Sequence, residues 1–241
     1  MGGQELLFEK KGAIGYLTFN RPDKLNAFNF ALIELLEKYL YEIERDKEVR
    51  VIILTGAGDK AFIAGSDISE LKKRTGFTGW LNSRIRQGLF RFLENLPQVS
   101  IAGINGYAFG GGVEIAMACT FRIASERARF GQTEANFGLI PGGGGTQRLC
   151  RLVGETRSIE MILTGKIIKA QEALKIGLVN RVVPHDELMK ECEKLAEGII
   201  ELEPYPVKVV RELVELGVSM DDRRLLRLTA ANFGLATALK S

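Results

Sequence analysis

A run of three glycines, followed by one carboxylate in an apolar stretch, constrains this chain more than any other feature. Gly110–Gly112 precedes Glu114, and every other residue of 113–119 is apolar. Consecutive glycines let a backbone approach a ligand closely and turn its N–H groups toward it, because no Cβ intervenes. A carboxylate among apolar side chains is either a functional group with a shifted pKa or a costly burial. A second carboxylate, Glu134, follows twenty residues later. This segment therefore contains the parts of a proton-transfer site.

Strands that alternate with helices at short intervals indicate an α/β core in residues 1–184. Apolar periodicity and β-branched runs define the elements of this core. The predicted strands are 6–9, 13–19, 49–55, 100–104 and 121–124, and the predicted helices are 30–45 and 80–96. After Pro184 the pattern is helical only, over 185–201, 207–216 and 221–239. We therefore expect a second, helical region at 185–241.

Charge and composition exclude several classes of protein. Lys and Arg number 33 and Asp and Glu 30, a net charge of +3, which suits a small anionic ligand but is too weak to indicate nucleic-acid binding. His185 is the one histidine, so neither a zinc site nor a Ser-His-Asp triad is expected, and we predict no metal. The longest apolar stretch, Ile101–Cys119, contains Asn105, Glu114 and five glycines, which argues against a membrane span.

The cysteines and the N-terminus predict a cytoplasmic protein. The three cysteines are odd in number, widely spaced and set in apolar contexts, so a disulfide framework is not expected. The first residues, Met1–Glu5, do not form a charged segment followed by an apolar one, so no signal peptide is expected.

Each motif also has an ordinary structural explanation. Gly110–Gly112 could serve only close packing of a helix on a strand, and Glu114 could form a buried ion pair with an arginine. Glu134 could be a solvated loop residue, Asp67 could cap a short helix, and Gly142–Gly145 could be a flexible turn. Their combination is more informative. Two glycine-lined corners could hold a carbonyl or thioester oxygen through backbone N–H groups, while two carboxylates move protons on the neighbouring carbons.

Segments covering nearly the whole chain in order resemble the crotonase superfamily, that is, enoyl-CoA hydratase/isomerase. They are Asn20–Pro22 with Leu25–Ala27, Ala61–Ile68, Ile104–Glu114, Phe130–Glu134, Gly138–Gly142 with Gly145–Leu149, and Ala170–Val179. The resemblance implies an α/β spiral of repeated β-β-α units as the acyl-CoA-binding core, with a helical C-terminal region used in homotrimer contacts and often in a dimer of trimers. Relatives usually continue past the position of Ser241 with a helix that closes over coenzyme A, so the resemblance leaves the helical region incomplete there.

The resemblance also implies the site. The thioester oxygen of an acyl-CoA would lie between the backbone N–H groups of Ser66 and Gly111. Glu114 would assist attack of water on C3, Glu134 would exchange the proton at C2, and the N–H of Gly142 would steady the water. The adenine pocket would be formed by Lys24, Leu25, Ala64, Asp67 and Ile68, with Ser69 where the family often has a lysine.

Glutamate at both carboxylate positions resembles the hydratases of this superfamily, so we expect reversible syn addition of water to trans-2-enoyl-CoA. Coenzyme A would be part of the substrate, and no other cofactor is expected. A Δ3,Δ2-enoyl-CoA isomerase, for which one carboxylate suffices, is the alternative. A non-catalytic member that binds acyl-CoA or RNA is disfavoured by the two glutamates and the low net charge. We expect Leu71, Trp80 and Ile85 to line the acyl site.

Overall fold

The computed structural model describes residues 4–239. Two predictions fall partly outside this range. They are the absence of a signal peptide, which concerned Met1–Glu5, and the incomplete end of the helical region at Lys240 and Ser241. The chain divides into two compact units between Lys194 and Leu195, within helix α8 (Leu188–Ile200).

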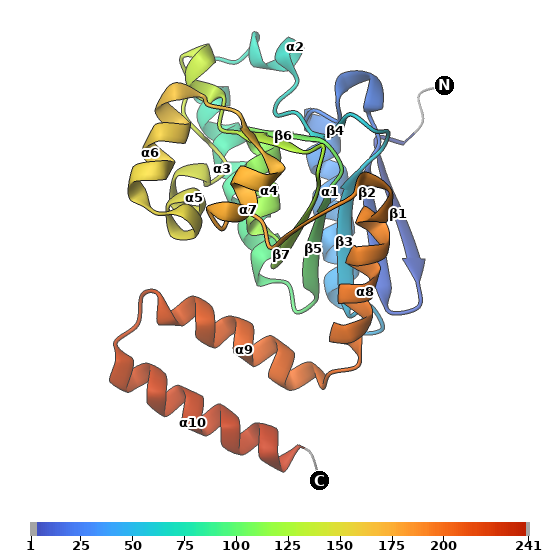
Figure 1. Ribbon diagram of the computed structural model, residues 1–241, viewed down its shortest axis with the longest axis vertical. Helices are drawn as coiled ribbons and strands as arrows, with labels where there is room; N and C mark the ends of the chain where they lie inside the picture. Colours follow the sequence, from blue (N-terminus) through green and yellow to red (C-terminus); the bar gives the residue numbers. More distant parts are fainter. Residues whose placement is uncertain (1–3, 240–241) are drawn as a thin grey trace. The chain divides into compact units, whose positions relative to one another are not determined.

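The first unit contains a six-stranded sheet that is parallel except at one edge (Figure 1). Its strands, in order across the sheet, are β1 (Leu6–Lys11), β2 (Ile14–Phe19), β3 (Val51–Gly56), β5 (Val99–Ile104), β7 (Phe121–Ser125) and β10 (Arg181–Val183). Only β1 pairs antiparallel, with β2. Every residue of β5 is buried, and every residue of β3 except Thr55, as expected for parallel strands covered on both faces.

A second, four-stranded sheet alternates with the first along the chain. Its strands, in order, are β4 (Ala61–Ile63), β6 (Tyr107–Phe109), β8 (Arg129–Gly131) and β9 (Ile168–Lys169). Each repeat places one strand in each sheet before a helix follows. The repeats are β3-β4 with α2 (Ile68–Leu71) and α3 (Gly76–Asn95), β5-β6 with α4 (Gly111–Ala118), and β7-β8 with α5 (Gly145–Val153). The predicted repeat of β-β-α units is confirmed.

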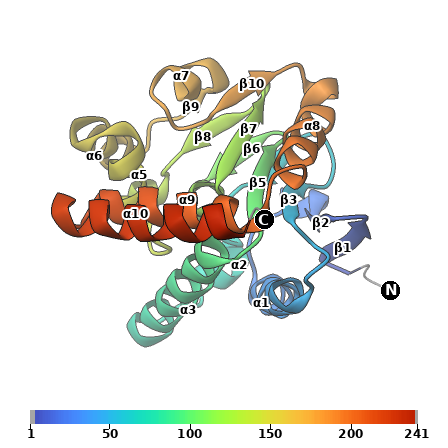
Figure 2. The ribbon, with the colours of Figure 1, turned by 90° about the horizontal axis from the view of Figure 1, so that it is seen from below.

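Helices cover both faces of the six-stranded sheet. Helix α1 (Phe30–Arg45) lies on one face and the beginning of α8 on the other, as Figures 1 and 2 show from two directions. The start of α1 is fixed by Asn29, whose side chain accepts a hydrogen bond from the N–H of Leu32 at 2.8 Å. Its apolar stripe, including Leu36 and Leu40, is fully buried. The range predicted from periodicity is therefore confirmed.

The remaining helices complete the two units. In the first unit they are α6 (Glu155–Thr164) and α7 (Ala170–Lys175), with 3₁₀ turns at Pro22–Lys24, Glu134–Phe137 and His185–Glu187. The second unit contains α9 (Pro204–Gly217) and α10 (Asp222–Ala238), joined by a hydrogen bond of 2.7 Å from the Tyr205 hydroxyl to Asn232. Among residues 4–239, no helix has the length and apolar character needed to cross a membrane.

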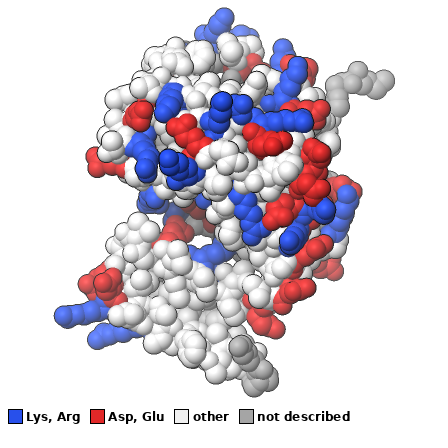
Figure 3. All heavy atoms as spheres, viewed as in Figure 1, with Lys and Arg blue, Asp and Glu red and all other residues white. Residues whose placement is uncertain are grey.

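Charged side chains of both signs share the surface of the first unit. On the face seen in Figure 3, Lys and Arg lie interspersed with Asp and Glu. Several form pairs, such as Lys10 with Asp46 and Glu48 at 2.7 and 2.6 Å. This face therefore carries no broad field of one sign, which is what phosphate-driven binding would need.

Candidate active site

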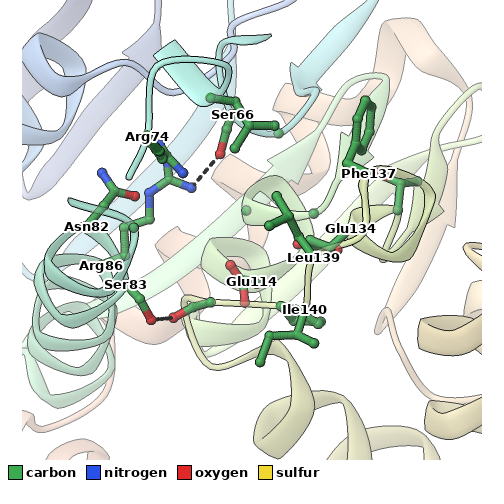
Figure 4. Close-up of a pocket in the computed structure, with 18 of the residues that line it drawn as sticks. Ser66, Arg74, Asn82, Ser83, Arg86, Glu114, Glu134, Phe137, Leu139 and Ile140 are labelled. Atoms are coloured by element: carbon green, nitrogen blue, oxygen red, sulfur yellow. Dashed lines mark hydrogen bonds between the residues drawn. The ribbon is translucent and has the colours of Figure 1, made fainter. Parts of the chain in front are cut away.

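A cavity of about 950 Å³ lies in the first unit. It is lined by parts of four segments, 64–68, 71–87, 109–114 and 133–147 (Figure 4). Ser66, Gly111, Glu114, Glu134 and Gly142 all line it. The structure thus brings together residues that lie far apart in the sequence.

Ser66 and Gly111 contribute backbone N–H groups that are free to bind a ligand. Ser66 follows β4, and Gly111 is the first residue of α4. Within the described part of the chain, neither N–H donates a hydrogen bond. The first N–H groups of a helix have no partner inside it, which explains the free donor at Gly111. Two such donors can stabilise an oxygen on which negative charge develops.

Glu114 projects from α4 into the cavity and is 1% exposed. Its Oε1 accepts hydrogen bonds from the N–H groups of Gly143 and Gly145, at 2.7 and 2.8 Å. Burial raises the pKa of this carboxyl, while the two N–H groups and the charge of Arg86 oppose that rise. No described residue donates a hydrogen bond to Oε2, so this oxygen is available to a ligand or a water.

Glu134 begins the 3₁₀ turn Glu134–Phe137 beside the same cavity. Burial, and then the negative charge of Glu114, raise its pKa to about 7. With its amide nitrogen turned toward the carboxylate, the fully buried Gln132 donates to both oxygens, at 3.2 and 3.0 Å. Near neutral pH this carboxyl can therefore either give or take a proton.

Gly142 contributes to the site through its peptide group. Its carbonyl accepts a hydrogen bond from the Ser83 hydroxyl at 2.6 Å (Figure 4) and another from the Gln87 amide at 3.0 Å. Both residues lie on α3. The same peptide group carries the N–H of Gly143, which donates to Glu114. Helix α3 thereby orients one of the two donors that hold Glu114.

Only some of the residues predicted to form the adenine pocket line the cavity. Ala64 and Ile68 line the cavity, whereas Lys24, Leu25, Asp67 and Ser69 are not among its described lining residues. Leu25 has a left-handed backbone, with φ of 50°, and its carbonyl accepts from the N–H of Ala64 at 3.0 Å. The loop that contains Lys24 and Leu25 is therefore attached to the segment that lines the cavity.

Asp67 supports this loop structurally. Its side chain caps α2 and accepts from both the N–H and the hydroxyl of Ser69, at 3.0 and 2.6 Å. It also accepts from Arg21 at 2.9 Å. The Ser69 hydroxyl and then Arg21 lower the pKa of Asp67 to about 2. The capping interpretation of Asp67 is confirmed.

Two of the three residues expected beside the acyl chain line the cavity. Leu71 and Trp80 do so, and Trp80 is 59% exposed at its mouth. Ile85 instead packs against the hydrophobic core, because it lies on another side of α3. The expectation for Ile85 was wrong.

Arg86 is a lining residue that sequence reasoning missed. It is 5% exposed, and its Nη1 donates to the Ser66 hydroxyl oxygen at 2.9 Å (Figure 4). It lies on the buried face of α3 together with Leu89, Phe90 and Leu93. A charged residue at a core-facing helical position was the signal that could have identified it. Among residues 4–239, no three His, Cys, Asp or Glu side chains are grouped so as to bind a metal ion.

Comparisons with known proteins show which family this chain resembles. Residues 9–240 match the family model for enoyl-CoA hydratase/isomerase. The chain is 44% identical to a short-chain-enoyl-CoA hydratase of Clostridium acetobutylicum, over 95% of this chain and 88% of that protein. It is 37% identical to a crotonyl-CoA hydratase of Syntrophomonas wolfei, over 99% and 92% respectively.

The fold is shared as well. The crystal structure of an enoyl-CoA hydratase from Bacillus anthracis superposes with a TM-score of 0.92 and 38% identity, covering 96% of this chain and 90% of that one. Sequence and fold agree over nearly the full length of the chain, which belongs to the enoyl-CoA hydratase/isomerase family of the crotonase superfamily.

Proposed function

We propose that this protein is an enoyl-CoA hydratase, a hydro-lyase that adds water reversibly and syn across trans-2-enoyl-CoA to give 3-hydroxyacyl-CoA. The observation that carries this proposal is the presence of two carboxylates, Glu114 and Glu134, in one cavity with the free N–H groups of Ser66 and Gly111. The similarity to hydratases that act on short enoyl-CoAs supports the same assignment.

The two N–H groups polarise the thioester. In the proposed complex its carbonyl oxygen accepts from Ser66 and Gly111, which draws electron density from C3 and makes that carbon electrophilic. As water adds, the oxygen gains the negative charge of an enolate. Donors already in place stabilise this charge by roughly 2.7–4 kcal/mol each in comparable sites.

The glutamates then divide the proton transfers. Glu114 is the base: its free Oε2 takes a proton from the water whose oxygen bonds to C3, while Oε1 stays bound to Gly143 and Gly145. Glu134, with a pKa of about 7, supplies the proton that C2 receives. Both carboxylates lie beside the bound water, and the N–H of Gly142 completes its coordination.

The proposal also covers the binding of coenzyme A, the assembly of the chain and its location in the cell. The adenine of coenzyme A binds beside Lys24, Leu25, Ala64, Asp67 and Ile68. Coenzyme A enters and leaves as part of the substrate, without a further cofactor. The helical region assembles the chain into a homotrimer or a dimer of trimers. Free cysteines, with Cys119 and Cys192 buried and reduced, support a cytoplasmic location.

Loss of enoyl-thioester absorbance with crotonyl-CoA tests the function. We expect wild type to turn over, and Glu114→Gln and Glu134→Gln each to lower kcat by about 10²-fold or more, as loss of a positioned acid or base predicts. Glu155→Gln, the same change at an exposed helix start, is expected to leave kcat unchanged. A wild type that binds coenzyme A but leaves both crotonyl-CoA and a longer 2-enoyl-CoA unchanged contradicts the proposal. A 3-enoyl-CoA would then test the isomerase alternative.

A further inference from the structure

Arg86 carries a buried charge without a counter-ion. Its guanidinium makes one hydrogen bond, from Nη1 to Ser66, while Nε and Nη2 are buried without a partner. No carboxylate among residues 4–239 lies within ion-pair distance of it. Burial, and then the charge of Arg74, lower its pKa to about 10, so it remains protonated at neutral pH. Because an unpaired buried charge is costly to the fold, its presence needs an explanation beyond packing.

This charge lies beside the two residues that carry the free N–H groups. Nη1 is bonded to the Ser66 side chain at 2.9 Å. The same nitrogen is 3.2 Å from the point that a Cβ on Gly111 would occupy. On another side, the guanidinium lies over the Phe28 ring, 5.2 Å from its centroid. Arg86 therefore contacts Ser66 and lies beside Gly111, and it is 5% exposed, so little water screens its charge.

We propose that Arg86 is a positioning residue that acts through Ser66 to stabilise negative charge on the thioester oxygen. This inference rests on the proposed function in one respect, that the thioester oxygen binds between the N–H groups of Ser66 and Gly111. The guanidinium orients the Ser66 side chain and adds a fixed positive charge beside the residues that carry the N–H groups. Such a charge favours the enolate over the neutral thioester, so it lowers the barrier more than it strengthens binding.

Other charges also act on Arg86. They are Arg74 on the segment before α3, Glu70 on α2, and the two glutamates of the site, Glu114 and Glu134. Arg86 lowers the pKa of both site glutamates. A simpler explanation is therefore that Arg86 only balances their negative charge. A readout of thioester polarisation separates the two explanations, because it reports on the carbonyl oxygen and not on the carboxylates.

Kinetics of four variants give the first test. Arg86→Met keeps length and apolar packing but removes the charge, and we expect it to lower kcat for crotonyl-CoA by about 10- to 10²-fold with KM within about threefold. Arg86→Lys restores the charge and is expected to recover part of this loss. Arg84→Met makes the same change at an exposed position of α3 and is expected to match wild type. Ser66→Ala combined with Arg86→Met is expected to lose little more than Arg86→Met alone, because the two act as a unit.

Absorbance of a bound push–pull ligand, 4-dimethylaminocinnamoyl-CoA, gives the deciding test. Its absorption maximum moves to longer wavelength as its carbonyl oxygen becomes more negative, and the measurement needs no turnover. We expect wild type, Arg84→Met and, in part, Arg86→Lys to shift the maximum, and Arg86→Met to shift it less although the ligand still binds. An equal shift in wild type and Arg86→Met, with both folded by circular dichroism, overturns the inference. If wild type fails to hydrate crotonyl-CoA but the shifts differ as expected, the proposed function fails and the inference stands.

Discussion

Glu114 and Glu134 have the same side chain, yet their surroundings differ in a way that fits the different proton transfers proposed for them. Burial raises the pKa of Glu114, and the two backbone N–H groups bound to its Oε1 oppose that rise because they stabilise the carboxylate. Glu134 lies next to that negative charge, which adds to burial in raising its pKa to about 7. The proposed base and the proposed acid are thus one residue type in two environments, and the charge of Glu114 contributes to the raised pKa of Glu134.

This coupling predicts that Glu114→Gln lowers the pKa of Glu134 below about 7. The charge of Glu114 raises that pKa, so its removal favours the ionised form of Glu134 at lower pH. Titration of the Glu134 carboxyl carbon by NMR, in protein labelled with ¹³C-glutamate, measures the change. Glu70→Gln removes a charge that does not act on Glu134 and serves as the control. An unchanged or higher Glu134 pKa in Glu114→Gln would show that the two carboxylates are not coupled.

The sequence indicated the proposed catalytic residues better than the residues that surround them. Ser66, Gly111, Glu114 and Glu134 lie in one cavity, as the resemblance implied. Arg86 was missed because a helical period is read from its apolar positions, and a buried charge among Leu89, Phe90 and Leu93 breaks that pattern. Such a violation of local rules is itself a sign of a functional position.

At the scale of elements, the three glycines before Glu114 serve three different purposes. A Cβ on Gly112 would be 2.0 Å from the carbonyl oxygen of Ile63, so this glycine permits close packing of α4 on β4. Gly110 has φ of 48°, and a Cβ there would be 2.8 Å from Glu134. Gly111 lines the cavity, and its N–H donates no hydrogen bond among the described residues. Close packing, one of the two explanations of this run, applies at Gly112. Ligand approach at Gly111 stays part of the proposed function.

Gly143, in the glycine run after Pro141, has no room for a larger side chain. A Cβ on Gly143 would lie 2.6 Å from Oε2 of Glu114 and 2.7 Å from the Phe90 ring. Since Phe90 is fully buried, we expect the carboxylate to move, and Gly143→Ala to lower kcat for crotonyl-CoA by about 10²-fold, a typical cost of misplacing a catalytic group by 1 Å.

Gly88→Ala is the matched control for this change. No heavy atom lies within 4 Å of a Cβ at Gly88, which is in the interior of α3. We expect unchanged kcat and a higher thermal midpoint, because alanine favours a helix over glycine by about 1 kcal/mol. Full activity in Gly143→Ala would mean that Glu114 does not need its present position.

Apolar periodicity predicted the long helices, but it did not predict the short strands. Helix α1 has its predicted range, whereas α3 begins at Gly76, before the predicted start at 80, because Thr75 and Thr78 form a capping box. Strands β4, β6 and β8 have three residues each, too few to show alternation. Together with β9 they form the second sheet, and they lead into the site. Only the repeated β-β-α units implied by the family resemblance indicated them.

At the scale of the whole molecule, the second unit has an exposed apolar stripe. Val210, Val214 and Val218 follow one another at intervals of four residues along α9 and its end, and are 58%, 69% and 70% exposed. Residues four apart lie on one side of a helix, so the three form a continuous surface. Contiguous apolar surface of this kind marks interaction sites in proteins, which agrees with the proposed assembly through the helical region.

Val214→Asp tests that assembly. By light scattering after size exclusion, we expect wild type to have three or six times the mass of one chain, and Val214→Asp a lower mass, because a buried unpaired carboxylate opposes association. Ser219→Asp adds the same charge at an exposed polar position after α9 and is expected to retain the wild-type mass. If wild type has the mass of one chain, the homotrimer proposal is wrong. If wild type and Val214→Asp share a larger mass, the subunits associate through a surface other than this stripe.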